Sequence, residues 1–326
     1  MPDTVFLEQL LQPLTPWLAC ADVSEIAING PGSVFVERAG VPAMERHVAP
    51  CCTESWIAQL ARQVAASTSQ AINREQPLLS ATLPSGERIQ VVLPPVTASG
   101  ALSIRKQVLR DLSLEQYASS GTFAGVTLSQ SSTSEVDRRL RQLLDAGDVH
   151  AFLSTAVRER RNVLLAGGTS SGKTTLLNAL AKEIPAHERI VTLEDTRELR
   201  LPHANVVSLV ASKGDQGDAR VTMQDLLEAS LRLRPDRILL GELRGSEAYT
   251  FLRAINTGHP GSLTTLHADS PARAFEQLAL MVLQAGLGLR RDEILEYVRS
   301  VIDVVVQVTR DAEGRRVVSD VQLLRA

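Results

Sequence analysis

Aromatic residues are scarce in this sequence of 326 residues. They make up 3% of the chain, and the formal net charge is −3. Lysine is also scarce, with four lysines beside 30 arginines. Proteins that hold DNA or RNA directly usually present a basic face with aromatic side chains on which bases stack. The composition therefore argues against direct nucleic-acid binding, and it makes Lys173 conspicuous.

Cysteine is equally rare, since the chain has only Cys20 and the adjacent pair Cys51 and Cys52. An odd count without any C-x-x-C spacing indicates neither a disulfide framework nor a thiolate zinc site, and it fits a reducing compartment. The first residues lack a secretion signal, and no run reaches the roughly 18 apolar residues that a membrane-spanning helix needs. We therefore expect a cytoplasmic protein that is still able to dock on a membrane.

Two globular domains fit the length and the composition. Hydrophobic residues make up 44% of the chain and charged residues 22%, which is typical of chains that bury a core. Residues 119–134 are rich in Ser, Thr and Gly and poor in large apolar residues, as linkers are. The sequence thus predicts an N-terminal domain over residues 1–118, a linker over 119–135 and a C-terminal domain over 136–326.

The N-terminal segment has the pattern of a mixed α/β domain. An apolar stripe at helical spacing covers residues 6–18, although Pro13 and Pro16 interrupt it. We expect this stripe to pack on its own domain rather than on a membrane surface, because its polar side carries no Lys or Arg. A helix is expected over residues 53–66. The predicted strands cover residues 25–28, 34–37, 88–93 and 101–105.

The C-terminal segment alternates apolar runs with helical stretches, a pattern typical of a parallel sheet covered by helices on both faces. The end differs, because residues 301–308 and 317–324 flank a polar turn and predict an antiparallel hairpin at the sheet edge. The predicted fold class is α/β, with a mainly parallel C-terminal sheet and a smaller mixed N-terminal domain. The apolar runs cover residues 162–166, 190–193, 238–240 and 262–266.

One motif predicts nucleotide binding. Residues 167–174 match the pattern G-x-x-x-x-G-K-[ST] in full, between a predicted strand and a predicted helix. The glycines let backbone N–H groups surround phosphate oxygens, Lys173 neutralises the β- and γ-phosphates, and the Thr174 hydroxyl is a ligand for Mg²⁺. The residues expected to bind ATP are Gly167, Gly168, Thr169, Ser170, Ser171, Gly172, Lys173, Thr174 and Thr175.

Polar residues follow the other apolar runs. Ligands of an open α/β sheet sit beyond the carboxyl ends of its strands, so we expect Glu194, Glu242 and His267 to meet at the phosphates. Hydrolysis needs a carboxylate that orients or deprotonates the attacking water, and we assign this role to Glu242. Glu194 and His267 complete this part of the predicted catalytic set. Asp195 joins Thr174 as a predicted ligand of Mg²⁺.

With these residues in view, the sequence resembles the hexameric secretion ATPases, and most closely the traffic ATPases of type IV secretion and conjugal transfer systems. The resemblance covers nearly the whole chain and four motifs in order. Gly241 stands where most P-loop enzymes carry the Walker B aspartate, a departure that is itself typical of this family. The motifs are the Walker A loop at residues 167–174, the aspartate box at 192–196, the Walker B variant at 238–245 and the histidine box at 258–268.

The resemblance implies an ATPase with a RecA-like C-terminal domain, assembled as a six-membered ring with ATP between its two domains. It also implies that the N-terminal domain supplies arginines to the γ-phosphate, and Arg88 and Arg105 lie in the matching stretches. Hydrolysis would then free the N-terminal domain to swing about the linker. The implied partners are further subunits and inner-membrane proteins of a secretion system, with peripheral attachment at the cytoplasmic face of that membrane.

Three alternatives compete with this interpretation. Type II secretion ATPases and type IV pilus motors are the nearest, but the former often carry a four-cysteine metal module after the sheet, and no cysteine follows Cys52. A nucleotide-gated adaptor with little turnover would not need Glu242. A DNA-translocating RecA-like motor disagrees with the acidic balance and the scarce aromatics. The sequence therefore favours the type IV secretion branch, without indicating its cargo.

Overall fold

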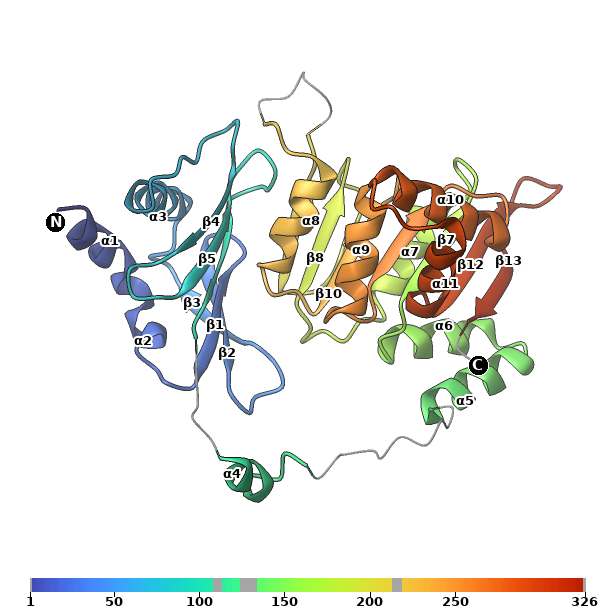
Figure 1. Cartoon of the computed structure of the whole chain (residues 1–326), viewed down its shortest axis with the longest axis horizontal. Coiled ribbons are helices and arrows are strands. Elements are labelled where there is room, and N and C mark those ends of the chain that lie inside the picture. Colours follow the sequence, from blue (N-terminus) through green and yellow to red (C-terminus); the bar gives the residue numbers. More distant parts are fainter. Residues whose placement is uncertain (1, 108–112, 124–133, 213–218, 325–326) are drawn as a thin grey trace.

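The computed structural model describes residues 2–107, 113–123, 134–212 and 219–324. Two α/β units lie side by side, each with its own sheet (Figure 1). The predicted fold class is confirmed, since the smaller N-terminal unit is mixed and the C-terminal sheet is mainly parallel. Part of the expected linker, residues 124–133, lies outside the described residues. The domain boundaries therefore stay a prediction.

The N-terminal sheet has six strands in the order β3-β2-β1-β6-β5-β4, and all neighbouring pairs are antiparallel. Leu7, Leu11 and Leu14 are buried in its core, so the N-terminal stripe packs on its own domain, as predicted. The strands are β1 (Val23–Ile28), β2 (Gly32–Arg38), β3 (Glu45–Ala49), β4 (Leu78–Thr82), β5 (Arg88–Val92) and β6 (Ala101–Arg105). The helical segments are α1 (Pro2–Leu11), η1 (Gln12–Leu14), α2 (Thr15–Leu18) and α3 (Glu54–Ser67).

The C-terminal sheet has seven strands in the order β13-β12-β7-β11-β10-β8-β9. Every pair is parallel except β12 and β13, which form the predicted antiparallel hairpin at the edge. The first hairpin strand starts at Val304 rather than at residue 301, because the preceding helix continues to Val301. The strands are β7 (Val163–Gly167), β8 (Ile190–Glu194), β9 (Val206–Val210), β10 (Arg237–Leu240), β11 (Leu263–Leu266), β12 (Val304–Arg310) and β13 (Arg316–Leu323).

Helices cover both faces of this sheet. Val163 and Leu165 of β7 belong to a core with α5, α6 and α7, while Leu164 and Ala166 belong to the opposite core with α8 to α11. This alternation is the period of two that a strand buried on both faces requires. Within the described ranges, no helix has the length and apolar composition needed to cross a membrane. The helices that cover the sheet are α5 (Glu135–Asp145), α6 (Val149–Arg158), α7 (Lys173–Ala181), α8 (Met223–Leu231), α9 (Glu247–Asn256), α10 (Pro271–Gln284) and α11 (Arg291–Val301). A further helix, α4 (Leu114–Ser119), lies apart from the sheet on the segment between the two units (Figure 1).

The N-terminal unit packs along the β9 edge of the C-terminal sheet. The Val210 N–H donates to the carbonyl of Val96 at 2.8 Å, and Val96 is buried in the C-terminal core. The buried Arg189 side chain links the units, because it donates to Asn29 at 2.7 Å and to Asn205 at 2.6 Å. The two units are therefore joined by apolar packing and by a buried polar network.

Candidate active site

The loop between β7 and α7 has the backbone shape of a phosphate-binding loop. Ser170 and Gly172 have positive φ angles of 58° and 105°, a backbone form in which successive N–H groups gather around an anion. A Cβ at Gly167 would lie 2.4 Å from the carbonyl oxygen of Val308, so only glycine fits beside β12. Residues 169–175, from the loop and the first turn of α7, line a cavity of about 540 Å³. The loop is therefore built to hold phosphate beside the N-terminus of α7.

Lys173 is held inside this loop. Its side chain is nearly buried, and Nζ donates to the carbonyl oxygens of Gly167 at 2.9 Å and Gly168 at 3.0 Å. Burial lowers the pKa of Lys173, and Arg244 acts in the same direction, whereas Glu242 acts against it. The ammonium group thus rests on carbonyl oxygens that phosphate oxygens are able to replace.

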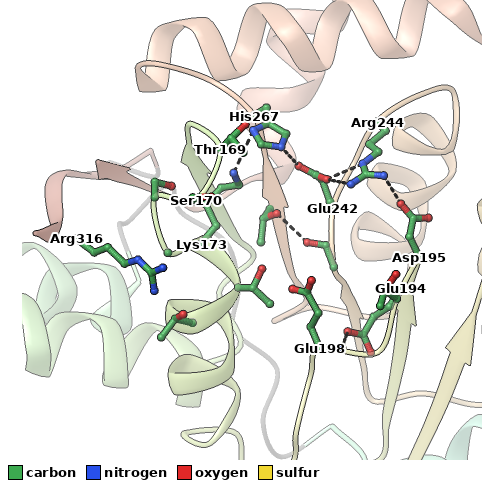
Figure 2. Close-up of a pocket in the computed structure, with 17 residues that line it drawn as sticks. Thr169, Ser170, Lys173, Glu194, Asp195, Glu198, Glu242, Arg244, His267 and Arg316 are labelled. Carbon is green, nitrogen blue, oxygen red and sulfur yellow. Dashed lines mark hydrogen bonds and ion pairs between the residues drawn. The ribbon is translucent and has the colours of Figure 1, made fainter. Parts of the chain in front are cut away.

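The carboxyl ends of β8, β10 and β11 open into the same cavity (Figure 2). The structure therefore brings Glu194, Asp195, Glu242 and His267 together with the P-loop, as expected from their places after the apolar runs. Arg244 and Arg316 also line the cavity and were not among the predicted site residues. The remaining lining residues outside the loop are Thr196, Glu198, Gly241 and Thr265.

A chain of hydrogen bonds crosses the cavity. His267 Nδ1 lies 3.2 Å from Lys173 Nζ, and His267 Nε2 lies 2.6 Å from Glu242 Oε1. Because an ammonium group only donates, Nδ1 accepts and Nε2–H donates to Glu242. On the other side, Arg244 Nε donates to Glu242 Oε2 at 2.6 Å, and the same guanidinium pairs with Asp195. Both carboxylate oxygens of Glu242 are therefore hydrogen-bonded.

Glu194 combines a place in the cavity with a structural contact. Its Oε1 accepts hydrogen bonds from the backbone N–H groups of Glu198 and Leu199, each at 2.8 Å. The side chain is nearly buried, so these two bonds keep its carboxylate satisfied. Glu194 thus orders the loop that follows β8 while it faces the predicted phosphate position.

The donor set fits a magnesium ion that is bound together with phosphate. Among the residues that the structure describes, no three His, Cys, Asp or Glu side chains gather as a metal cage. Mg²⁺ does not need one, because it usually binds one or two protein oxygens together with phosphates and water. Thr174 and Asp195 line the cavity, although Asp195 also pairs with Arg244. The Ser171 hydroxyl is buried with no hydrogen-bond partner in the described part of the chain, which marks a place for a polar ligand.

Arg88 and Arg105 lie elsewhere. They face each other in the register of β5 and β6, and both side chains are exposed. They line a second cavity of about 500 Å³ together with Arg232 and Arg234. The latter two residues precede β10, at the amino ends of the parallel strands, whereas the P-loop cavity lies at the carboxyl ends. Within one chain, the predicted γ-phosphate arginines therefore do not line the P-loop cavity.

No local pattern could have singled out Arg316, whereas Arg244 lies within a recognised motif. Arg316 is one of 30 arginines, and it reaches the cavity only because the edge hairpin folds beside the P-loop. Arg244 lies in the Walker B variant at residues 238–245, two residues after Glu242, and this position is the sequence signal that could have found it.

Known proteins resemble the chain over nearly its whole length. The family model of type II/IV secretion system proteins matches residues 8–322. The type IV secretion system protein VirB11 of Bartonella quintana is 41% identical over 326 residues, which cover 95% of this chain and 91% of the relative. VirB11 of Brucella suis is 42% identical over 317 residues, which cover 94% and 87%.

A solved structure agrees with the fold as well. The crystal structure of the VirB11 ATPase from the Brucella suis type IV secretion system, in complex with sulphate, superposes with a TM-score of 0.91 at 40% identity and covers 97% of both chains. These matches confirm the resemblance expected from the four motifs. The chain therefore belongs to the family of type II/IV secretion system proteins, as an ATPase of its type IV secretion branch.

Proposed function

We propose that this ATPase works as a ring of subunits that hydrolyses ATP with Mg²⁺ and uses the energy to move its N-terminal domains, which drives type IV secretion. The observation that carries the proposal is the convergence of Lys173, His267 and Glu242 in one cavity at the carboxyl ends of the parallel strands. In this arrangement a phosphate-binding cation and a candidate base are linked through one imidazole.

Lys173 is the group that would respond first to the nucleotide. The β- and γ-phosphates would replace the carbonyl oxygens of Gly167 and Gly168 at its Nζ, because a charge-assisted bond to phosphate is stronger than a bond to a neutral carbonyl. When Lys173 turns to phosphate, His267 Nδ1 loses its donor. Occupancy of the P-loop is thereby transmitted to the imidazole that holds Glu242.

Glu242 is the proposed base. Its Oε1 accepts one hydrogen bond, from His267, and keeps a second lone pair with which it is able to accept a proton from water. The water oxygen then attacks the γ-phosphorus, the bond to the bridging oxygen breaks, and the water proton passes to Glu242. The products are ADP and phosphate. We propose that Glu194 keeps the neighbouring loop in place during this step, and that His267 reports whether a γ-phosphate is present.

Thr174 and Asp195 are the residues that would hold Mg²⁺, together with phosphate oxygens. The ion would supply positive charge that neutralises the phosphates. Before Asp195 is able to contribute, it must exchange its ion pair with Arg244. Such an exchange would also loosen Arg244 from Glu242, because one guanidinium holds both carboxylates.

The positions of Arg88 and Arg105 support the proposed ring. Arg88 and Arg105 are exposed and line a cavity with Arg232 and Arg234, near the amino ends of the parallel strands of the C-terminal sheet and away from the P-loop of their own chain. We propose that they serve the γ-phosphate held by a neighbouring subunit. Hydrolysis would remove their ligand and release that N-terminal domain, and this movement would act on partner proteins at the cytoplasmic face of the inner membrane.

The test is ATP hydrolysis per subunit, measured over a range of protein concentrations for the wild type, Lys173→Ala and Glu242→Gln. If a ring is needed, the specific activity of the wild type rises with concentration. Both variants should be inactive at every concentration. A wild-type specific activity that does not change with concentration would contradict the ring, and full turnover by Glu242→Gln would contradict the assigned base.

A further inference from the structure

The antiparallel hairpin of β12 and β13 covers one side of the P-loop. Its backbone approaches Gly167 so closely that no side chain fits between them. Arg310, the last residue of β12, also donates to the carbonyl oxygen of Ser170 through a terminal nitrogen at 3.1 Å. The hairpin is therefore part of the wall that shapes the phosphate-binding loop.

Arg316 extends this wall into the cavity. It is the first residue of β13 and pairs in register with Arg310. Its side chain crosses the N-terminus of α7, because a Cβ at Gly172 would lie 2.9 Å from Arg316 Cδ, and it lines the P-loop cavity. A cation so close to the phosphate-binding loop is placed to interact with a polyphosphate.

The guanidinium group of Arg316 is available to a ligand, unlike that of the neighbouring Arg315. Arg315 pairs with Asp311 at 2.7 Å and with Glu313 at 3.1 Å within the hairpin turn. In the part of the chain that the structure describes, Arg316 forms no ion pair with a carboxylate. Its planar fork of N–H donors matches the geometry of phosphate oxygens.

The order of the strands decides which end of the nucleotide Arg316 faces. β12 and β13 lie on one side of β7, while β11 and β10, which lead into His267 and Glu242, lie on the other. Figure 2 shows the same arrangement, with Arg316 and Glu242 on opposite sides of Lys173. Because Glu242 marks the γ-phosphate, the opposite side belongs to the end of the polyphosphate that carries the nucleoside.

We propose that Arg316 is a nucleotide-binding residue that contacts the α-phosphate of ATP from the C-terminal hairpin. ADP keeps the α-phosphate, so Arg316 contributes to the binding of ADP as much as to that of ATP. Arg316 thus contributes to binding of the nucleotide in the ground state, in contrast to the residues at the γ-phosphate. Its removal raises KM and leaves kcat unchanged. The inference depends on the ATPase activity and on no feature of the ring.

The experiment compares Arg316→Ala and Arg316→Gln with the matched control Arg315→Ala in the full chain. The dissociation constant of ADP is measured by calorimetry for each protein, and that of ATP is measured in the same variants carrying Glu242→Gln, which prevents turnover. We expect both Arg316 variants to weaken ADP and ATP alike by about tenfold, as the loss of one charge-assisted contact predicts. Arg315→Ala should stay within about twofold of the wild type.

Three results would overturn the proposal. Unchanged ADP affinity in both Arg316 variants would show that the side chain does not touch the nucleotide. Weaker ATP binding with unchanged ADP binding would place the guanidinium at the γ-phosphate. An equal loss of nucleotide affinity in Arg315→Ala would show that the effect comes from the overall positive charge of the hairpin and not from a contact of Arg316. The unfolding midpoint of each variant is measured alongside, and Arg316→Gln keeps the test valid if the alanine variant folds poorly.

Discussion

Glu242 owes its place to two neighbours from different parts of the sequence. His267 comes from the end of β11 and Arg244 from the turn after β10, and each binds one of its carboxylate oxygens. A carboxylate held on both sides keeps a fixed position beside the phosphate-binding loop. Fixed placement of the proposed base would contribute to catalysis, because less reorganisation is needed in the transition state.

Replacing Glu242 with Gln keeps the shape of this side chain but removes its ability to accept a proton. We expect kcat to fall by about 10² to 10⁴, while the dissociation constant of ATP stays within about threefold. The matched control is Glu276→Gln, an exposed carboxylate that pairs with Arg291 and does not line the P-loop cavity. Retention of more than about a tenth of kcat in the Glu242 variant would refute the assignment.

Lys173 is predicted to bind phosphate at a cost to stability. Its pKa is lowered mainly by burial, so the native state binds this proton less tightly than the unfolded chain does. The charged side chain therefore opposes folding near neutral pH. This penalty falls as the pH rises through the native-state pKa toward the pKa of the unfolded chain.

The variant Lys173→Met keeps the length of the side chain and removes the charge. Without nucleotide we expect its unfolding midpoint at pH 7 to equal or exceed that of the wild type, and the difference to shrink toward pH 10. The exposed Lys182, at the end of the same helix, serves as the control Lys182→Met and should show no such trend. A midpoint well below that of the wild type at pH 7 would contradict the account.

At the scale of elements, the two ends of the parallel strands carry residues with different roles. The carboxyl ends of β8, β10 and β11 carry the residues of the cavity, as the geometry of open sheets requires. The amino ends carry buried polar groups that hold the sheet together. Arg237, the first residue of β10, is fully buried and pairs with Glu188 at 2.7 Å.

Removal of Glu188 would leave the Arg237 charge buried without its partner. We expect Glu188→Ala to lower the free energy of unfolding by about 3 to 5 kcal/mol. The control is Glu183→Ala, whose partner Arg158 has a side chain that is 63% exposed, and it should cost less than about 1 kcal/mol. Denaturant unfolding measures both values. Equal losses in the two variants would show that burial of the pair does not matter.

Most of the strands that the sequence predicts are central ones, and this has a physical reason. The exception is the edge strand β13, which the polar turn before it marks as one half of a hairpin. Strands β7, β8, β10 and β11 are buried on both faces, so their sequences are continuous apolar runs. The unpredicted strands β3, β4 and β9 all lie at sheet edges and are only partly buried. A short edge strand needs fewer apolar residues, and β3 (ERHVA) is mostly polar, so its composition does not distinguish it from a loop. Composition does not explain β9, since VVSLV is itself an apolar run that could have been predicted.

The candidate site was also predictable only in part. Glu194 and His267 directly follow apolar runs and Glu242 follows one after a single glycine, so their convergence can be derived from the rule for open sheets. Arg316 reaches the cavity through the pairing of the edge hairpin with β7, which is a tertiary contact without a local signature. The position of Arg88 and Arg105 away from the P-loop depends on how the two units pack, and the sequence carries no pattern for that packing.

At the scale of the whole molecule, the packing of the two units decides which arginines are able to reach the P-loop of their own chain. The contacts of Asn29, Arg189 and Val96 hold the N-terminal unit along the β9 edge of its own chain. In that position Arg88 and Arg105 lie near the amino ends of the parallel strands of the C-terminal sheet, whereas the P-loop lies at their carboxyl ends. The proposed mechanism therefore requires a second subunit, since each ATP has to receive its arginines from a neighbour.

The most direct test of this claim is a mixture of two inactive variants. Lys173→Ala subunits lack phosphate binding but keep their arginines, whereas subunits with Arg88→Ala and Arg105→Ala keep the P-loop. Co-expressed at equal amounts with different tags and purified together, they should recover about a quarter of wild-type ATP hydrolysis, since about that share of sites combines both intact halves. A mixture that stays as inactive as each variant alone would contradict the assignment of the arginines to a neighbouring subunit.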